Sequence, residues 1–284
     1  MPVFVSFVAL AVAAGLVWHG SNVHRVFKET LTEQFQDLQS EIAKSSAQGI
    51  ESVVARLTSD MLSLAAAPRM QDIDSPQTME LLIDFYRSNQ DIAYAGYRMS
   101  NEGILTDMYP VDENSLYADI RYQKHVVNLF ETRRLVISGL FRAVEGFDAI
   151  AIHAPVFKGR EMNGSVATII KLDSITSRFL RGIEIGEGGY AWLVDEDGAI
   201  IYHPDGGVIG KKLKDDHPVF DEEVCDALAR EIWRGRPMTM QIGDTLFSIH
   251  PFMIGDRTWT VVISTPYAAI SGPISDHWRN MMIL

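Results

Sequence analysis

The sequence has almost no cysteine, and it lacks the short motifs that mark common enzyme classes. Cys225 is the one cysteine among 284 residues, so an internal disulfide framework is excluded. No Gly-x-Ser-x-Gly elbow, phosphate-binding loop or dinucleotide fingerprint occurs, and no His and Asn arrangement matches Cys225. We therefore expect no catalytic residues and no cofactor in this chain; any enzymatic output would lie beyond it.

Metal-ligand spacing is also missing. His203 and His217 have neither a partner at the i,i+4 spacing nor the cysteines of a zinc site. The acidic run at residues 195–197 lacks the twelve-residue loop of a calcium-binding EF-hand. We expect a turn at 195–197, a local hydrogen bond at His203 and no bound metal.

Positive charge is scarce over the whole chain. The 25 Lys and Arg residues against 37 Asp and Glu give a formal net charge of −12. This balance argues against nucleic acid as a partner and against wide contact with anionic lipid. Hydrophobic residues make up 47% of the chain, enough for one large core or two smaller ones. Since no linker rich in Pro, Gly or Ser occurs, two units would be packed together.

Both ends of the chain have membrane-like composition. Residues 1–18 are apolar and carry no charge, a length that a tilted bilayer helix needs. They predict an uncleaved transmembrane anchor at 1–20, with a cleaved signal peptide as the alternative. Trp278 and Arg279 precede a final apolar run, which predicts that a C-terminal helix at 267–284 enters a truncated second span, with a chance apolar tail as the alternative. The predicted location is the inner membrane, with a periplasmic or extracellular body.

A long helix should connect the anchor to the body. Apolar residues recur at three- and four-residue spacing from Val23 to Leu64, and Pro68 follows, which predicts a helix over 21–66 within the segment 21–70. At ~1.5 Å per residue it would be on the order of 60–70 Å long. Its apolar positions exceed one packing face, which predicts a homodimer through paired helices. A core helix without a signalling role is the alternative.

A strand–turn–strand pattern appears twice, at residues 94–110 and 190–204. In both copies an apolar run meets a polar turn closed by Gly103 or Gly198, and the second strand stops at Pro. A helical stretch and further strands then follow in both halves. This repetition predicts an α+β fold of two antiparallel-sheet units, at 71–183 and 184–266, with a boundary near 181–189.

The remaining elements follow from the apolar patterns. Helices are expected at 76–89, 118–132, 173–183 and 219–233. Besides the two hairpins, strands are expected at 135–143, 147–157, 162–172, 238–242, 245–253 and 258–264. Each unit would hold an antiparallel sheet of about five strands flanked by helices.

One run in the second unit resembles a known family. From Gly186 to Pro204, and on to Gly210, it has a glycine-rich turn, Gly-Tyr, a strand ending in Asp, then His-Pro and Ile-Gly. This is similar to the membrane-proximal signature of double Cache (PAS-like) domains, the extracytoplasmic sensors of bacterial and archaeal chemoreceptors, histidine kinases and cyclic-dinucleotide enzymes. Similar stretches are Pro155-Val-Phe, Leu172-Asp-Ser-Ile and Ser264-Thr-Pro, and the resemblance as a whole covers about 21–276.

The resemblance implies two tandem PAS-like units that share a long N-terminal helix. It implies a small-molecule pocket in the membrane-distal unit, 71–183, and a membrane-proximal unit, 184–266, that often has no ligand. The expected function is ligand sensing for a transmembrane receptor whose output module (kinase, cyclase or chemoreceptor) is not encoded here. The alternative is a membrane-tethered binding protein without signalling output; a reading frame continuing past Leu284 would distinguish the two.

The family also implies ligand contacts. In its amino-acid-binding members the pocket begins with a Tyr, an Arg a few residues on, and a Trp-Tyr pair. Tyr117 and Arg121 have similar spacing, but Tyr122 and Gln123 follow, without Trp. Those members place an Asp near the end of the last distal strand, where this chain has Ile169. Since Ile cannot bind an ammonium group, an organic acid is favoured over an amino acid.

Arg121 suits such a carboxylate, because its planar guanidinium holds one in two parallel hydrogen bonds. Tyr117 and His125 lie at i−4 and i+4, which would put all three on one face of the predicted helix. His125 would add a donor whose charge is tunable near neutral pH. The alternative is a solvated or salt-bridged Arg121 and a surface His125.

Three polar residues of the following strands complete the predicted ligand site. Ser138 and Arg142 alternate to a common face of the strand at 135–143, and Asp148 lies on its neighbour. All three would close the pocket from the sheet side.

Overall fold

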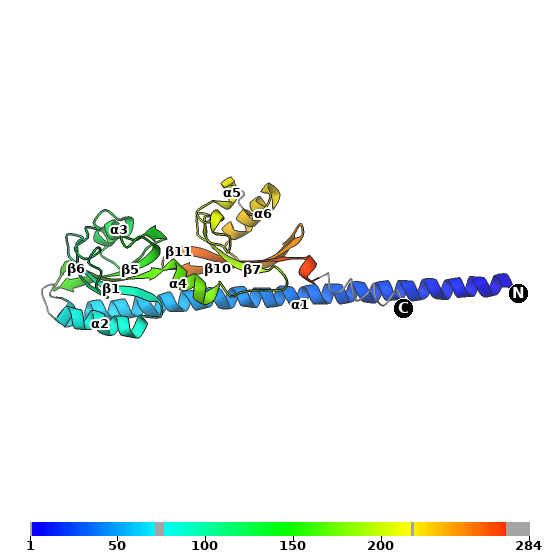
Figure 1. Cartoon of the computed structure of the whole chain (residues 1–284), viewed down its shortest axis with the longest axis horizontal. Helices are drawn as coiled ribbons and strands as arrows, with labels where there is room; N and C mark the ends of the chain where they lie inside the picture. The colour runs from blue at the N-terminus through cyan, green and yellow to red at the C-terminus, as the bar shows by residue number, and fades with distance from the viewer. Residues whose placement is uncertain (1, 72–76, 217–218, 271–284) are drawn as a thin grey trace.

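A single helix runs beneath two sheets (Figure 1). The structure, a computed structural model, describes residues 2–71, 77–216 and 219–270. Helix α1 spans Pro2–Ala66 and is followed by the 3₁₀ turn η1, Pro68–Met70, with Pro68 at its first position. The predicted helix over 21–66 is therefore confirmed, and it continues toward the N-terminus. Because α1 extends past the second unit, the first unit lies farther from the helix's N-terminal end.

The predicted membrane segments are only partly covered. Most side chains of the predicted anchor at 1–20 lie outside the described part of the structure, and so do residues 271–284 of the predicted second span. Within the described residues, no helix combines the length and apolarity needed to cross a membrane.

The distal unit is an antiparallel sheet covered by helices on both faces (Figure 1). Its strand order is β2-β1-β6-β5-β3, with β4 also paired to β5. The helices are α2 (Gln77–Asn89), α3 (Lys124–Thr132) and α4 (Leu172–Phe179). The strands are β1 (Ala93–Met99), β2 (Leu105–Tyr109), β3 (Val136–Ile137), β4 (Phe141–Arg142), β5 (Asp148–Lys158) and β6 (Glu161–Lys171).

The proximal unit repeats this plan, with strand order β8-β7-β11-β10-β9. In both sheets the first hairpin pairs with the last strand, so the predicted α+β fold of two PAS-like antiparallel units on a shared helix is confirmed. The short helical elements are η2 (Gly206–Val208), α5 (Leu213–Asp216) and α6 (Glu222–Trp233). The strands are β7 (Tyr190–Val194), β8 (Ile200–Tyr202), β9 (Met238–Ile242), β10 (Thr245–Ile254) and β11 (Arg257–Pro266).

Both sheets pack on one stripe of α1. Ala43, Ile50, Leu57 and Met61 are fully buried at spacings of four and seven residues, and they join one hydrophobic cluster with strands of both units. Burying a side chain such as Ile50 or Leu57 contributes about 1.5–3 kcal/mol. Gln39 adds a hydrogen bond of 2.7 Å to the Thr265 hydroxyl of β11. The long helix is therefore part of both cores.

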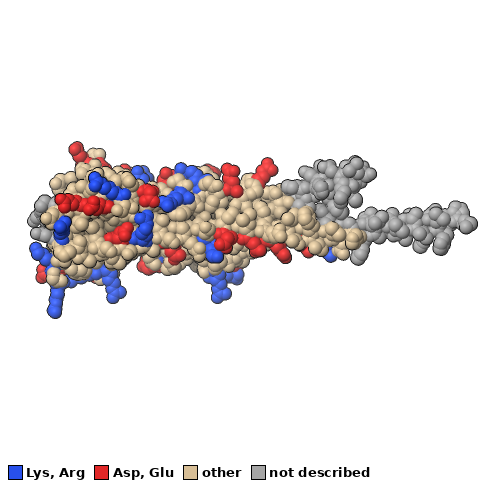
Figure 2. All heavy atoms as spheres, turned by 90° about the horizontal axis from the view of Figure 1, so that it is seen from below, with Lys and Arg blue, Asp and Glu red and all other residues tan. Residues whose placement is uncertain are grey.

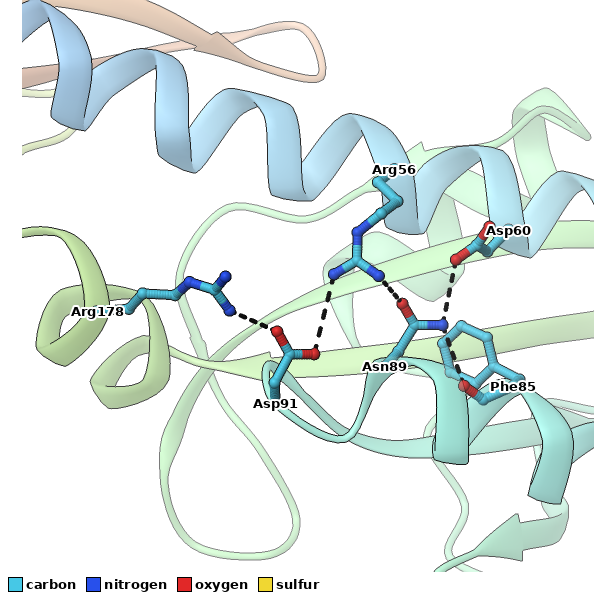
Figure 3. A network of polar contacts seen from close by, with 6 residues as sticks. All are labelled: Arg56, Asp60, Phe85, Asn89, Asp91 and Arg178. Atoms are coloured by element: carbon cyan, nitrogen blue, oxygen red, sulfur yellow. Dashed lines mark hydrogen bonds and ion pairs between the residues drawn. The ribbon is translucent and has the colours of Figure 1, made fainter.

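A polar network ties α1 to the distal unit (Figure 3). The buried amide of Asn89 accepts from Arg56 and donates to Asp60 at 3.1 Å. Arg56 and Arg178 of α4 both face Asp91, and the hydrogen bond from Arg178 is the main cause that lowers the pKa of that carboxyl. This network fixes the ends of α2 and α4 against the helix.

Charges of both signs are interspersed over the face shown in Figure 2. Basic and acidic side chains alternate there along the whole body instead of forming one basic field.

Two predicted elements of the distal unit are wrong. The helix predicted over 118–132 begins at Lys124, because the segment before it bridges β2 through Ile104 and Asp119. The strand predicted over 135–143 is broken into β3 and β4. The Ser138 hydroxyl, which accepts the Ala151 N–H at 2.8 Å and donates to the Gly139 carbonyl at 2.7 Å, replaces regular ladder pairing at the break.

A pair of glycine variants tests the close approach of β6 to β1. Gly164 and Gly146 both have positive φ, but a Cβ on Gly164 would lie 1.9 Å from the Met99 carbonyl oxygen, whereas one on Gly146 meets nothing within 4 Å. We expect Gly146→Ala to cost ~1–2 kcal/mol of unfolding free energy. Gly164→Ala should cost about 3 kcal/mol more or prevent folding. Urea unfolding measures both, and equal losses would contradict the close approach.

Candidate functional site

The face of the distal sheet that points away from α1 carries several alanines on its central strands. Of the fourteen buried residues in the cluster on this face, five are alanine. Four of them, Ala95, Ala149, Ala151 and Ala167, lie on the three central strands. A methyl group fills little of the space between a sheet and a covering helix, so this face leaves room where larger side chains would close it.

A cavity of about 30 Å³ lies over this face. Its walls come from β1, β5 and β6 below, from α3 and the chain before it, and from the β4–β5 turn. The lining residues are Tyr97, Leu105, Ile120, Gln123, His125, Phe141, Ala143, Val144, Glu145, His153, Ala167 and Ile169. This volume is far below the roughly 300–1,000 Å³ of typical small-molecule pockets, so the cavity is too small for a ligand in this structure.

Two buried histidines face each other in this wall. The rings of His125, from α3, and His153, from β5, have centroids 5.1 Å apart. Burial lowers the pKa of His125 to about 4. Burial first, and His125 second, lower the pKa of His153 well below its ordinary value. Both imidazoles are therefore neutral at pH 7, and each offers one N–H donor and one nitrogen acceptor.

The third polar group is a tyrosine paired with a carboxylate. The Tyr97 hydroxyl donates to Glu145 Oε1 at 2.7 Å. Burial, followed by the charge of Glu145, raises the pKa of Tyr97, so the phenol keeps its proton. The cavity thus offers hydrogen-bonding atoms and one carboxylate, and no Lys or Arg is among the described residues that line it.

The proximal unit has the same topology but a filled face. Where β1, β6 and β5 carry the cross-strand rows Tyr97–Ala167–His153 and Ala95–Ile169–Ala151, strands β7, β11 and β10 carry Trp192–Val262–Ile249 and Tyr190–Ser264–Phe247. Trp192 and Phe247 are fully buried, and the Trp192 indole donates to the Ser264 hydroxyl at 2.8 Å. In these rows Tyr190, Phe247 and Val262 stand where the distal unit has Ala95, Ala151 and Ala167, so larger side chains occupy the space that the alanines leave open.

Arg121 and Tyr117 of the predicted site lie outside the cavity wall. Because α3 begins at Lys124, the prediction that Tyr117, Arg121 and His125 share a helix face is wrong. Tyr117 is 71% exposed and adopts φ 67°. The Arg121 Nε lies 2.9 Å from Asp119 Oδ1, with both side chains over 40% exposed. His125 alone of the three lines the cavity.

Ser138, Arg142 and Asp148 do not share a face either. Ser138 is buried and its hydroxyl serves the backbone at the strand break. Arg142 and Asp148 form an exposed ion pair of 3.2 Å. This pair borders a separate cleft of about 970 Å³ at the junction of the two units.

The sequence analysis missed Tyr97, Glu145 and His153. Tyr97 and His153 are polar residues that follow inward-facing alanines on their strands, Ala95 on β1 and Ala149 and Ala151 on β5, and this contrast is visible in the sequence. Glu145 lies in the turn after β4, and nothing in its local pattern indicates that it faces Tyr97.

No metal centre occurs within the described residues, where no group of three or more metal-ligating side chains comes together. His203 Nδ1 accepts the Asp205 N–H at 3.0 Å, in agreement with the predicted local hydrogen bond. Cys225 is buried, and burial raises the pKa of its thiol, which disfavours the reactive thiolate.

Comparisons with known proteins agree on the family to which this chain is similar. The model of the Cache domain family matches residues 23–274. The methyl-accepting chemotaxis protein PscA of Pseudomonas syringae pv. tomato is 23% identical over 218 residues, which cover 75% of this chain and 33% of PscA. The chain thus spans about a third of the length of that relative.

Solved structures share the fold. The ligand-binding domain of the Pseudomonas aeruginosa amino acid chemoreceptor PctC, in complex with GABA, has a TM-score of 0.63 at 21% identity, covering 81% of this chain and 99% of that one. The periplasmic sensory domain of the Campylobacter jejuni chemoreceptor Tlp1 has a TM-score of 0.66 at 17% identity, covering 86% and 99%.

The neutral histidines predict a loss of stability in acid. Since the pKa of His125 is about 4 in the folded state and about 6.5 in an unfolded chain, the unfolded state binds more protons between these values. The stability is complete above pH 6.5 and is lost as the pH falls toward 4, by about 2 kcal/mol from pH 7 to pH 4.5. We expect His125→Gln to remove this part of the pH dependence, measured by urea unfolding, whereas His19→Gln, at an exposed position of α1, should not.

Proposed function

Since the chain belongs to the Cache domain family, we propose that it is the ligand-sensing domain of a transmembrane receptor and binds a small molecule in the distal unit. The observation that carries this proposal is the difference between the two sheets. The distal face presents Ala95, Ala151 and Ala167 with polar groups around them, whereas the equivalent proximal face is filled by Trp192 and Phe247. A ligand site needs space next to a few directed polar atoms.

The polar groups favour a ligand that carries an amino group. Glu145 supplies a carboxylate, and His125 and His153 are neutral, so a protonated amine gains a charge-assisted hydrogen bond. A free carboxylate lacks a cation on this wall and would meet Glu145 as a like charge. The organic acid predicted with Arg121 would instead have to displace Asp119 from that guanidinium.

The solved relatives suggest which amines to include. PctC was crystallised with GABA and the Pseudomonas fluorescens chemoreceptor CtaA with L-isoleucine. Both molecules carry an amino group as well as a carboxylate. A screen for this chain should therefore contain amines, amino acids and organic acids without nitrogen, so that the two charged groups are tested separately.

We also propose that the receptor sits in the inner membrane with this domain in the periplasm, and that it acts as a homodimer. Val23, Phe27 and Leu38 are about half exposed along α1, an apolar face that a second α1 would cover. Cross-links between paired helices in membranes at Gln34, an exposed position seven residues after Phe27 and four before Leu38 on the same face, check the dimer. A tethered binding protein without signalling output would show no change in these cross-links on ligand addition.

Two variants, one at Glu145 and one at Arg121, test whether the ligand is held by its amino group or by a carboxylate. Calorimetry of the screen should give an amine or amino acid as its tightest hit. For that hit, Glu145→Gln should cost about 2 kcal/mol, roughly thirtyfold in affinity, because the ammonium loses its charge partner. Arg121→Ala should leave the affinity within about twofold. If Arg121→Ala abolishes binding while Glu145→Gln does not, the carboxylate bound at Arg121 is correct and the amine is wrong.

A further inference from the structure

The cavity must widen before a ligand can enter, because its volume of about 30 Å³ is far below that of typical small-molecule pockets. The sheet strands that form its floor resist movement. Strands β1 and β6 are paired on both sides, and β5 pairs with β6 along most of its length. The wall formed by β4 is weaker, since it pairs with β5 only at Phe141 and Arg142. Movement should therefore begin in the segment 138–142.

Phe141 closes this wall against the histidines. Its ring centroid lies 4.5 Å from that of His125, and its side chain lines the cavity. On its other side is a cleft of about 650 Å³ between the two units. Phe141 and His125 border this cleft as well, together with Glu196 and Arg257 of the proximal unit. The cleft gives Phe141 room to move out of the cavity.

The proximal unit holds the neighbouring backbone in place. A Cβ on Gly139 would lie 3.2 Å from Nη1 and 3.3 Å from Cζ of Arg257, so the guanidinium packs on bare backbone. Arg257 is ion-paired to Glu196, with both side chains about 30% exposed. A Cβ on Gly255, in the β10–β11 turn, would lie 3.0 Å from the Ile137 Cβ. Segment 137–139 is thus pinned two residues before Phe141.

We propose that the β10–β11 turn is a latch on the distal cavity, in which Arg257, held by Glu196, keeps Gly139 and therefore Phe141 in the closed position. The latch would regulate the ligand site of the proposed function, so this inference rests on that function. A ligand that needs the open cavity must work against the latch, and by linkage it weakens the contact between the units. Ligand occupancy in the distal unit would thereby change the contact with β10 and β11, the two proximal strands that pack most on α1.

Accessibility of His125 to a chemical reagent reports opening without any ligand. Diethyl pyrocarbonate modifies neutral imidazoles, and peptide mass spectrometry gives a rate for each histidine. His125 is 7% exposed and His203, in the proximal unit, is 8% exposed, so His203 is a matched control for unfolding. The test variants are Arg257→Ala and Glu196→Gln. The control is Arg234→Ala, which removes an ion pair with Glu231 at the C-terminal end of α6.

We expect Arg257→Ala to speed modification of His125 about two- to fivefold, the factor that a partly exposed ion pair gives to an opening equilibrium. Glu196→Gln should give a smaller rise at His125, and both variants should leave His203 unchanged. An unchanged His125 rate in both variants would overturn the latch. Equal acceleration at His125 and His203 would also overturn it, because the contact would then stabilise the whole fold. Since no ligand is used, the latch and the proposed amine binding fail separately.

Discussion

The burial of one apolar stripe of α1 against two sheets is the interaction on which the rest of this structure depends. Ile50, Leu57 and Met61 belong to the same cluster as strands of both units, so neither sheet completes its core without the helix. One face of each sheet packs against α1. The opposite face of each sheet does not contact α1. The two units have the same strand order, and their side chains differ on this face.

That divergence is a matter of side-chain volume. Tryptophan and phenylalanine fill the proximal face, and the indole hydrogen bond to Ser264 fixes the larger of them. Alanines on the distal face leave space that two neutral histidines, a tyrosine and a glutamate surround. Such a site has the mixture of apolar walls and few directed polar atoms that small-molecule pockets share. Because the distal cavity is too small for a ligand in this structure, it has to widen for binding. The wall proposed to move, at Phe141, borders the cleft between the two units.

The sequence predicted the fold better than the site, for physical reasons. Hairpins such as 94–110 were predictable because turn glycines and alternation are local signals, and the long helix because its stripe is periodic. The helix start at Lys124 was missed because a bridge between Ile104 and Asp119, distant in sequence, overrides local propensity. That same error placed Arg121 beside His125. Glu145 and Tyr97 meet only through tertiary packing, which no spacing along the chain encodes.

The central claim is that ligand binds over the alanine face of the distal sheet. Methyl NMR on protein labelled with ¹³C at alanine methyl groups tests it most directly, during titration with the tightest amine from the binding screen. The account predicts that the resonances of Ala95, Ala151 and Ala167 shift with saturation, while that of Ala191, which is in the proximal unit and packs in the cluster on α1, shifts little. Shifts confined to the proximal unit, or to residues around Arg121, would contradict it.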